Sequence, residues 1–249
     1  MKYCFTTLAI GEEYERNALK LFKDLKNKTT NCDFFLATNN VECKDFEDDR
    51  IKINIIDPIK TVDSRPGFNF NVNLKCLALK SSLTHVKNDH TLLPYDFIFY
   101  IDGDWSVMES FDESKIKNIF NYMVNESKDF VFERPALVKE SRLDPENSFF
   151  REKIYDYDIL EYTGWDNAHV CNEQLLLFKN NYKFKFFVQR WEQFLWYTIQ
   201  NDIRNYAEGF EIGISALEAG MEYNWGAFQA FLGSCFSFYT KEGVWHGRF

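Results

Sequence analysis

The sequence predicts an α/β fold in which a central sheet is flanked by helices. The first 56 residues have the pattern of a strand, a helix and two further strands. The run at 95–101 is apolar except for one charge near its start, which is typical of a central strand covered on both faces. No repeat, linker or low-complexity segment divides the 249 residues, so we expect one domain over residues 1–249.

The N-terminal elements are predicted from apolar periodicity and turn residues. Residues 3–10 form an apolar run, and Gly11 with two following glutamates begins a helix. The apolar positions of this helix recur at helical spacing and are Tyr14, Ala18, Leu21, Phe22 and Leu25. Short strands are predicted at 33–38 and 51–56, each closed by a polar or proline-containing turn.

The remaining elements follow the same rules. A polar and aromatic loop at 61–73 precedes a helix through residues 74–83, and the strand at 95–101 stops at Asp102-Gly103-Asp104. Residues 135–168 are rich in charge and aromatic side chains and are expected to form an irregular insertion over an active site. Further helices are predicted at 113–123, 182–199 and 211–219, and further strands at 130–132 and 171–178.

Charge and cysteine usage restrict the partners and the compartment. The formal net charge is −9 and no dense basic block is present, which disfavours nucleic acid as a partner without excluding it as an acceptor. The six cysteines form no CxxC pair, so we expect a reducing, cytoplasmic environment. We expect no secretory signal and no membrane span, since no 18-residue window is apolar and free of charge.

Asp102 and Asp104 are the residues with the strongest chemical signal. Two carboxylates so close together at the end of a buried strand repel each other and raise each other's pKa. Carboxylate oxygens suit Mn²⁺ or Mg²⁺, which bridge protein carboxylates to substrate phosphates. Ligands of open α/β sheets bind at the carboxyl ends of the strands, and Gly103 would let a diphosphate approach the backbone there. The pattern therefore predicts a cation and a phosphate-bearing ligand at this turn.

Two segments of the chain resemble a known enzyme family. Asn73-Leu-Lys-Cys-Leu-Ala-Leu-Lys80 and Tyr95-Asp-Phe-Ile-Phe-Tyr-Ile-Asp-Gly-Asp104 resemble the lysine-bearing helix and the Asp-x-Asp strand of GT-A glycosyltransferases. The likeness is greatest to retaining enzymes such as the blood-group A/B and α1,3-galactosyl transferases. It implies a GT-A (nucleotide-diphospho-sugar transferase, Rossmann-like) fold with a mixed central sheet flanked by helices. It also implies a nucleotide-sugar-binding half at 1–105 and an acceptor-binding, catalytic half at 106–249.

The resemblance implies roles for residues of the N-terminal half. Thr6, Thr7 and Ala9 at the end of the first strand would meet the base and ribose of the donor. Arg65 or Lys75 would lie near its phosphates or sugar. The structural alternatives are an ordinary strand position for the two threonines and a solvated helix face for Lys75.

Residues of the C-terminal half are assigned in the same way. The segment 166–178 is similar to the one that contacts donor sugar and acceptor in these enzymes, and Glu211 falls at the position of the family's candidate nucleophile. Gly209-Phe210 departs from the family's His-Asp, so Glu173 and Glu208 remain alternatives, and Glu211 could instead be a first-turn acid that favours the helix dipole. His246 resembles a third metal ligand from the C-terminus, or else is an exposed side chain.

These observations predict a metal-dependent glycosyltransferase that moves a sugar from a UDP-sugar to a hydroxyl of a glycan or another acceptor, with retention. One alternative is a haloacid-dehalogenase-like phosphatase with Asp102 as nucleophile, although that motif normally lies near the N-terminus. A sugar nucleotidyltransferase would need a glycine-rich phosphate loop after the first strand, which the chain lacks. A non-catalytic carbohydrate-binding protein would use the abundant aromatic side chains to stack on sugar rings.

Overall fold

The computed structural model describes residues 1–57, 72–84, 95–137, 163–200, 208–233, 235–240 and 243–245. Arg65 and His246 lie outside these residues, as do most of the loop predicted at 61–73 and residues 138–162 of the predicted insertion. The expectations for these residues therefore stay predictions.

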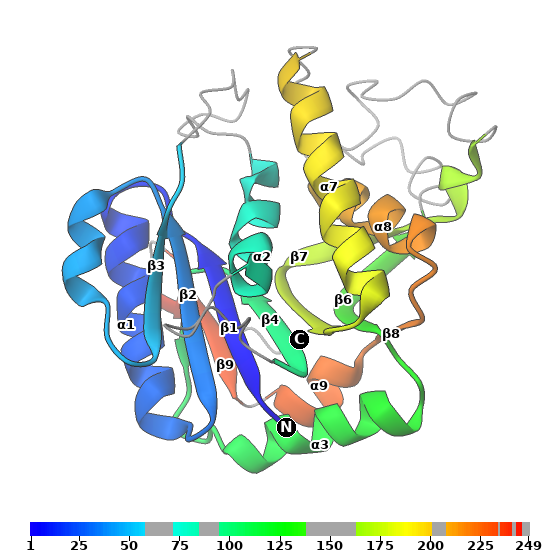
Figure 1. The fold of residues 1–249 in the computed structure, drawn as a ribbon. Coiled ribbons are helices and arrows are strands. Elements are labelled where there is room, and N and C mark those ends of the chain that lie inside the picture. Colours follow the sequence, from blue (N-terminus) through cyan, green and yellow to red (C-terminus); the bar gives the residue numbers. More distant parts are fainter. Residues whose placement is uncertain are drawn as a thin grey trace.

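A seven-stranded sheet forms the centre of the fold (Figure 1). Its strands, in spatial order, are β3 (Ile51–Ile55), β2 (Cys32–Thr38), β1 (Tyr3–Leu8), β4 (Phe97–Ile101), β7 (His169–Lys179), β6 (Phe130–Leu137) and β8 (Tyr223–Trp225). β3, β2, β1 and β4 are parallel, whereas β7 runs antiparallel to both of its neighbours. The predicted α/β fold with a mixed central sheet is therefore confirmed.

Helices cover both faces of the sheet. One face packs against α1 (Glu12–Lys28), α3 (Glu113–Asn125) and α9 (Ala227–Leu232), and the other against α2 (Lys75–Thr84), α7 (Tyr182–Gln200) and α8 (Glu208–Glu218). Figure 1 shows α2, α7 and α8 grouped together. A smaller sheet of β5 (Trp105–Val107), β9 (Phe236–Thr240) and β10 (Gly243–Trp245) adjoins α1. The 3₁₀ helices are η1 (Val41–Phe46), η2 (Val72–Leu74) and η3 (Trp165–Asn167).

β1 shows why the central strands are apolar on both faces. Its six residues are all buried, because alternate side chains enter the two hydrophobic clusters on opposite sides of the sheet. Phe5 faces α1 and stacks on Phe99 of β4 with ring centroids 4.5 Å apart, whereas Cys4 lies in the cluster beneath α2 and α7. Burial on both faces is what the continuous apolar runs at 3–10 and 95–101 predict.

The longer predicted elements are confirmed within a few residues, with two corrections. Tyr14 is not a core residue of α1, since 43% of it is exposed, and Leu19 is buried on that helix instead. β6 continues to Leu137, so the predicted insertion does not begin at 135. The sequence does not predict the short strands β5, β8, β9 and β10 or the short helix α9.

Candidate functional site

The Asp102-Gly103-Asp104 turn joins the two sheets at the carboxyl end of β4. The backbone NH of Asp102 donates to the carbonyl oxygen of Gln174 at 2.9 Å, which continues the pairing of β4 with β7 by one residue. The NH of Trp105 then donates to the carbonyl oxygen of Asp102 at 3.2 Å, and β5 begins. Both aspartates are thus held on a turn whose two ends are fixed by strand pairing.

Lys75 neutralises Asp102 in this structure. Its Nζ lies 3.1 Å from Oδ1 and 3.3 Å from Oδ2 of Asp102, and the lysine is only 8% exposed because it is the first residue of α2 beneath the sheet edge. The hydroxyl of Tyr100 donates to the same Oδ1 at 2.8 Å, since residues 100 and 102 of the strand point to the same face. Lys75 is therefore not on a solvated helix face but contacts a predicted cation ligand directly.

Asp104 lacks a comparable partner. Its Oδ1 is buried and accepts no hydrogen bond from any residue that the structure describes. Burial, together with the nearby charge of Asp102, raises the pKa of Asp104 from its ordinary value of 3.8 to about 6, although Lys75 opposes the shift. A positively charged group that binds next to Asp104 would stabilise its ionised carboxylate.

The donor set fits a hard divalent cation. Asp102 and Asp104 provide oxygen ligands for such a cation. Together with the ammonium group of Lys75, the two carboxylates carry one net negative charge at neutral pH. The described residues contain no group of three His, Cys, Asp or Glu side chains placed to hold a metal. Substrate phosphate oxygens and water are the usual additional ligands of Mg²⁺-type sites.

Gly103 packs against α1. A Cβ at this position would lie 3.0 Å from Cβ of Ala18 and 3.4 Å from the carbonyl oxygen of Tyr14. The absence of a side chain therefore lets the turn approach the first part of α1 closely. Its predicted contact with a diphosphate stays a prediction.

Tyr14 is a member of the site that the sequence did not indicate. Its pKa is raised by partial burial and then by the negative charge of Asp104, and its backbone carbonyl oxygen lies next to Gly103 of the turn. The ring is 43% exposed and can contact a ligand. Its helical spacing with Ala18 and Leu21 is indistinguishable from that of a core residue, so periodicity alone predicted burial.

The three residues predicted to meet the base and ribose are buried. Thr6 is fully buried and its hydroxyl donates to the carbonyl oxygen of Ala78 in α2 at 2.7 Å. Thr7 is also fully buried, but its Oγ1 has no hydrogen-bond partner among the described residues. Ala9 is 1% exposed and follows β1, with its NH donating to the carbonyl oxygen of Ala37. Their donor-binding roles stay predictions.

Glu15 links the turns that follow β1 and β2. This residue of α1 is 4% exposed, and its carboxylate accepts hydrogen bonds from the hydroxyl of Thr38 at 2.9 Å, the side-chain amide of Asn40 at 2.8 Å and the NH of Gly11 at 3.3 Å. It thereby holds the ends of β1 and β2 together.

The two candidate catalytic glutamates differ in exposure. Glu173 is half-buried on β7, next to Gln174, whose carbonyl oxygen binds Asp102. Glu211 is fully buried as the fourth residue of α8. Glu173 is thus adjacent in sequence to the residue that pairs with Asp102, and the structure describes the backbone but not the side chain of Glu208.

Two glycines of α8 lie against the backbone of β7. A Cβ on Gly209 would lie 2.2 Å from the carbonyl oxygen of Cys171, and one on Gly213 would lie 1.8 Å from that of His169. α8 therefore packs directly on the backbone of β7, and a histidine at position 209 would not fit.

Comparisons with known proteins give fold likeness only. No protein-family model matches the chain, and no curated protein matches it in sequence. Similar solved structures include the galactosyltransferase LgtC in complex with donor and acceptor sugar analogues, which is 13% identical with a TM-score of 0.47 over 92% of this chain and 74% of that chain. Core-mannan synthase A from Aspergillus fumigatus, in its Mn/GDP form, is 10% identical with a TM-score of 0.47 over 95% and 74%. The glycosyltransferase GlyE of Streptococcus pneumoniae TIGR4 is 14% identical with a TM-score of 0.49 over 92% and 46%. At these values the similarity carries no inference about donor, acceptor or metal.

Proposed function

We propose that the chain is a metal-dependent GT-A glycosyltransferase that transfers a sugar from a UDP-sugar to an acceptor hydroxyl with retention. The observation that carries the proposal is Oδ1 of the partly buried Asp104, which is itself buried and accepts no hydrogen bond in the described structure. A buried polar atom without a partner is unfavourable and therefore points to a missing ligand. The resemblance of residues 73–80 and 95–104 to the GT-A pattern supports the class of ligand.

Asp102 and Asp104 would hold Mn²⁺ or Mg²⁺, with His246 as a third protein ligand. The bound cation would act as a Lewis acid that stabilises the negative charge on the departing diphosphate. Lys75 and the hydroxyl of Tyr100 fix the orientation of Asp102, so that the carboxylate is positioned before the ligand arrives. The exposed ring of Tyr14 would contact the donor, with Thr6, Thr7, Ala9 and Arg65 nearby.

A carboxylate on the other side of the sugar would stabilise the oxocarbenium-like transition state or form a covalent intermediate, which gives retention. Glu173 fits this role because its half-buried side chain lies on the strand that pairs with the aspartate turn. Glu211 is the second candidate, and its full burial requires α8 to move before a sugar could reach it. The acceptor would be a glycan or another hydroxyl-bearing molecule.

We also propose that the protein works in a reducing compartment, the cytoplasm. All six cysteines are buried and none forms a disulfide. Among the helices of the described residues, none is both long and apolar enough to cross a bilayer.

The direct test measures nucleotide release from a panel of UDP- and GDP-sugars with Mn²⁺, with Mg²⁺ or with EDTA. We expect release of UDP only with the metals, and a loss of about 100-fold or more in Asp104→Asn. Asp112→Asn is the matched control, because Asp112 is an exposed helix cap of α3 and asparagine caps equally well. Product anomeric configuration, read by NMR, tests retention, and metal-independent release or full activity in Asp104→Asn would overturn the proposal.

The phosphatase alternative keeps one supporting observation. Lys75 beside Asp102 would hold a nucleophilic aspartate ionised. Hydrolysis of p-nitrophenyl phosphate with a trapped aspartyl-phosphate on Asp102 would favour that function over sugar transfer.

A further inference from the structure

Lys75 is the counter-ion of Asp102 in this structure. Its Nζ contacts both carboxylate oxygens, at 3.1 Å and 3.3 Å. Tyr100 supports this arrangement, because its hydroxyl donates to Oδ1 at 2.8 Å and its ring centroid lies 5.5 Å from the same Nζ. Both charged side chains are largely buried. The pair is therefore shielded from water, and its attraction is stronger than that of an ion pair on the surface.

The charge of Lys75 also acts on Asp104. It lowers the pKa of Asp104, although burial and the charge of Asp102 have the larger effect and raise that pKa to about 6. One ammonium group thus compensates part of the charge of both carboxylates. A divalent cation held by the two aspartates would lie beside this ammonium group, and the two positive charges would repel each other. Lys75 and the cation therefore compete for the same carboxylates.

The side chain of Lys75 can leave Asp102 while α2 stays in place. Lys75 is the first residue of α2, and the helix is attached to the sheet by the fully buried Cys76, Ala78 and Leu79. The hydroxyl of Thr6 in β1 also donates to the carbonyl oxygen of Ala78. The charge of a lysine is carried on a flexible four-carbon stem, so it can move without the backbone.

We propose that Lys75 exchanges one anionic partner for another, from Asp102 before the cation binds to the diphosphate of the donor afterwards. This inference rests on the proposed function and adds a binding order to it. When a cation binds alone, the ammonium group loses its pair with Asp102 in a shielded position, which is unfavourable. A nucleoside diphosphate restores a negatively charged partner, since lysine binds phosphate as a point charge. Lys75 thereby makes the binding of cation and nucleotide positively cooperative.

A lysine that only orients Asp102 would act in the opposite direction. Removal of its ammonium group would then leave the carboxylate less well positioned and weaken cation binding, both with and without nucleotide. The exchange predicts instead that a cation alone binds more tightly once the ammonium group is removed. The sign of the change in Mn²⁺ affinity therefore separates the two roles.

Electron paramagnetic resonance of free Mn²⁺ measures this affinity with and without UDP, with UDP alone as the blank. Lys75→Gln removes the charge but keeps a hydrogen-bond donor for Asp102. We expect this variant to bind Mn²⁺ alone about tenfold more tightly than wild type, and the gain in Mn²⁺ affinity caused by UDP to fall about tenfold. Lys75→Arg keeps the charge and should retain the wild-type effect of UDP.

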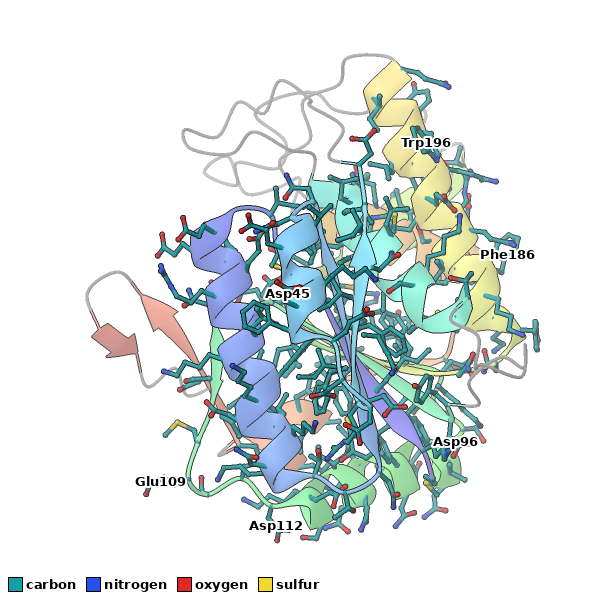
Figure 2. All side chains as sticks on the ribbon, turned by 60° about the vertical axis from the view of Figure 1, so that its left-hand side comes forward. Asp45, Asp96, Glu109, Asp112, Phe186 and Trp196 are labelled. Carbon is teal, nitrogen blue, oxygen red and sulfur yellow. The ribbon has the colours of Figure 1, made fainter. Side chains whose placement is uncertain are left out.

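Two controls test whether the effect is specific to this lysine. Lys80→Gln is the matched control, because Lys80 lies on the same helix with its Nζ 2.7 Å from both oxygens of Glu192. Asp112→Asn changes a charge outside the site, and Figure 2 shows Asp112 at the start of α3, on the outside of the molecule. Both variants should bind Mn²⁺ as wild type does. Circular dichroism establishes that each variant is folded.

A second measurement needs no variant. Acetylation of Lys75 by acetic anhydride, quantified by mass spectrometry, should be slow in the protein alone, because the amine is shielded in its ion pair. Acetylation should rise several-fold when Mn²⁺ is added and fall again with UDP, whereas that of Lys80 should not change.

The outcomes separate this inference from the function on which it rests. Weaker binding of Mn²⁺ alone by Lys75→Gln, or an unchanged effect of UDP, would overturn the exchange and leave the cation site intact. So would an acetylation rate of Lys75 that does not respond to Mn²⁺. Wild-type protein that binds no Mn²⁺ even with UDP would overturn both the exchange and the proposed function.

Discussion

The ammonium group of Lys75 lies 3.1 Å from Oδ1 of Asp102, so one of the two aspartates in the Asp-x-Asp turn is neutralised by the protein itself. Asp104, two residues further on, has no such neighbour among the described residues. Of the two carboxylates, Asp104 is therefore the one expected to depend on an external cation.

Replacement of Asp104 should stabilise the ligand-free protein at neutral pH. The folded-state pKa of Asp104 is raised from 3.8 to about 6, so the folded state holds this proton more tightly than the unfolded state. Its contribution to the free energy of unfolding is largest below 3.8, falls as the pH rises to about 6, and stays low above that. Asp104→Asn removes this pH-dependent loss of stability. Urea unfolding at about pH 4.5 and about pH 7.5 should show that the free energy of unfolding of the variant, relative to that of wild type, is greater at the higher pH. If the free energies of unfolding of the variant and wild type differed by the same amount at both pH values, the burial of a charged Asp104 would be contradicted.

Stabilisation by Mn²⁺ should increase with pH. Protons and the metal compete for Asp104, whose pKa is about 6. The rise in melting temperature caused by Mn²⁺ should therefore be small at about pH 5 and larger at about pH 7.5. Asp112→Asn should follow wild type, whereas Asp104→Asn should show little rise at either pH.

Lys75→Met should destabilise the fold by about 3–5 kcal/mol, because it leaves Asp102 without its partner in a largely buried position. The double variant Lys75→Met/Asp102→Asn removes both charges and should recover much of that loss. Chemical denaturation of wild type, Lys75→Met, Asp102→Asn and the double variant gives the coupling energy, and additive effects would show that the pair contributes little.

Gly213→Ala should destabilise the protein even though alanine favours helices. The added Cβ would lie 1.8 Å from the carbonyl oxygen of His169, so α8 must move away from β7. We expect a loss of about 1–3 kcal/mol in the free energy of unfolding, whereas an unhindered helical position would gain about 1 kcal/mol. A more stable Gly213→Ala protein would show that α8 is not packed on the backbone of β7.

The sequence predicted the long elements because burial leaves a local pattern. β1 and β4 are apolar on both faces, and α7 has one buried and one exposed side. The apolar pattern within each segment was therefore sufficient to predict it. The strands β5, β8 and β10 have three residues each, too few to show a periodic pattern. β5 and β8 also form through pairing with β9 and β6, which lie far away in the sequence.

The site was predictable only in part. Asp102 and Asp104 can be recognised in the sequence because two carboxylates directly follow the apolar strand at 95–101. The partner of Asp102 lies 27 residues earlier in the chain, and only the packing of α2 beneath β4 brings Lys75 to it. Tyr14 was assigned to the core because its spacing is helical, although 43% of the residue is exposed. The glycines at 209 and 213 became explicable only once α8 was seen against β7.

The most direct measurement is electron paramagnetic resonance of Mn²⁺ titrated into the protein with and without UDP. We expect the signal of free Mn²⁺ to fall on binding, more strongly with UDP present, in wild type and in Asp112→Asn, and to remain unchanged in Asp104→Asn. Equal binding by wild type and by a folded Asp104→Asn protein, or no binding by either with UDP present, would contradict a cation site at the end of β4.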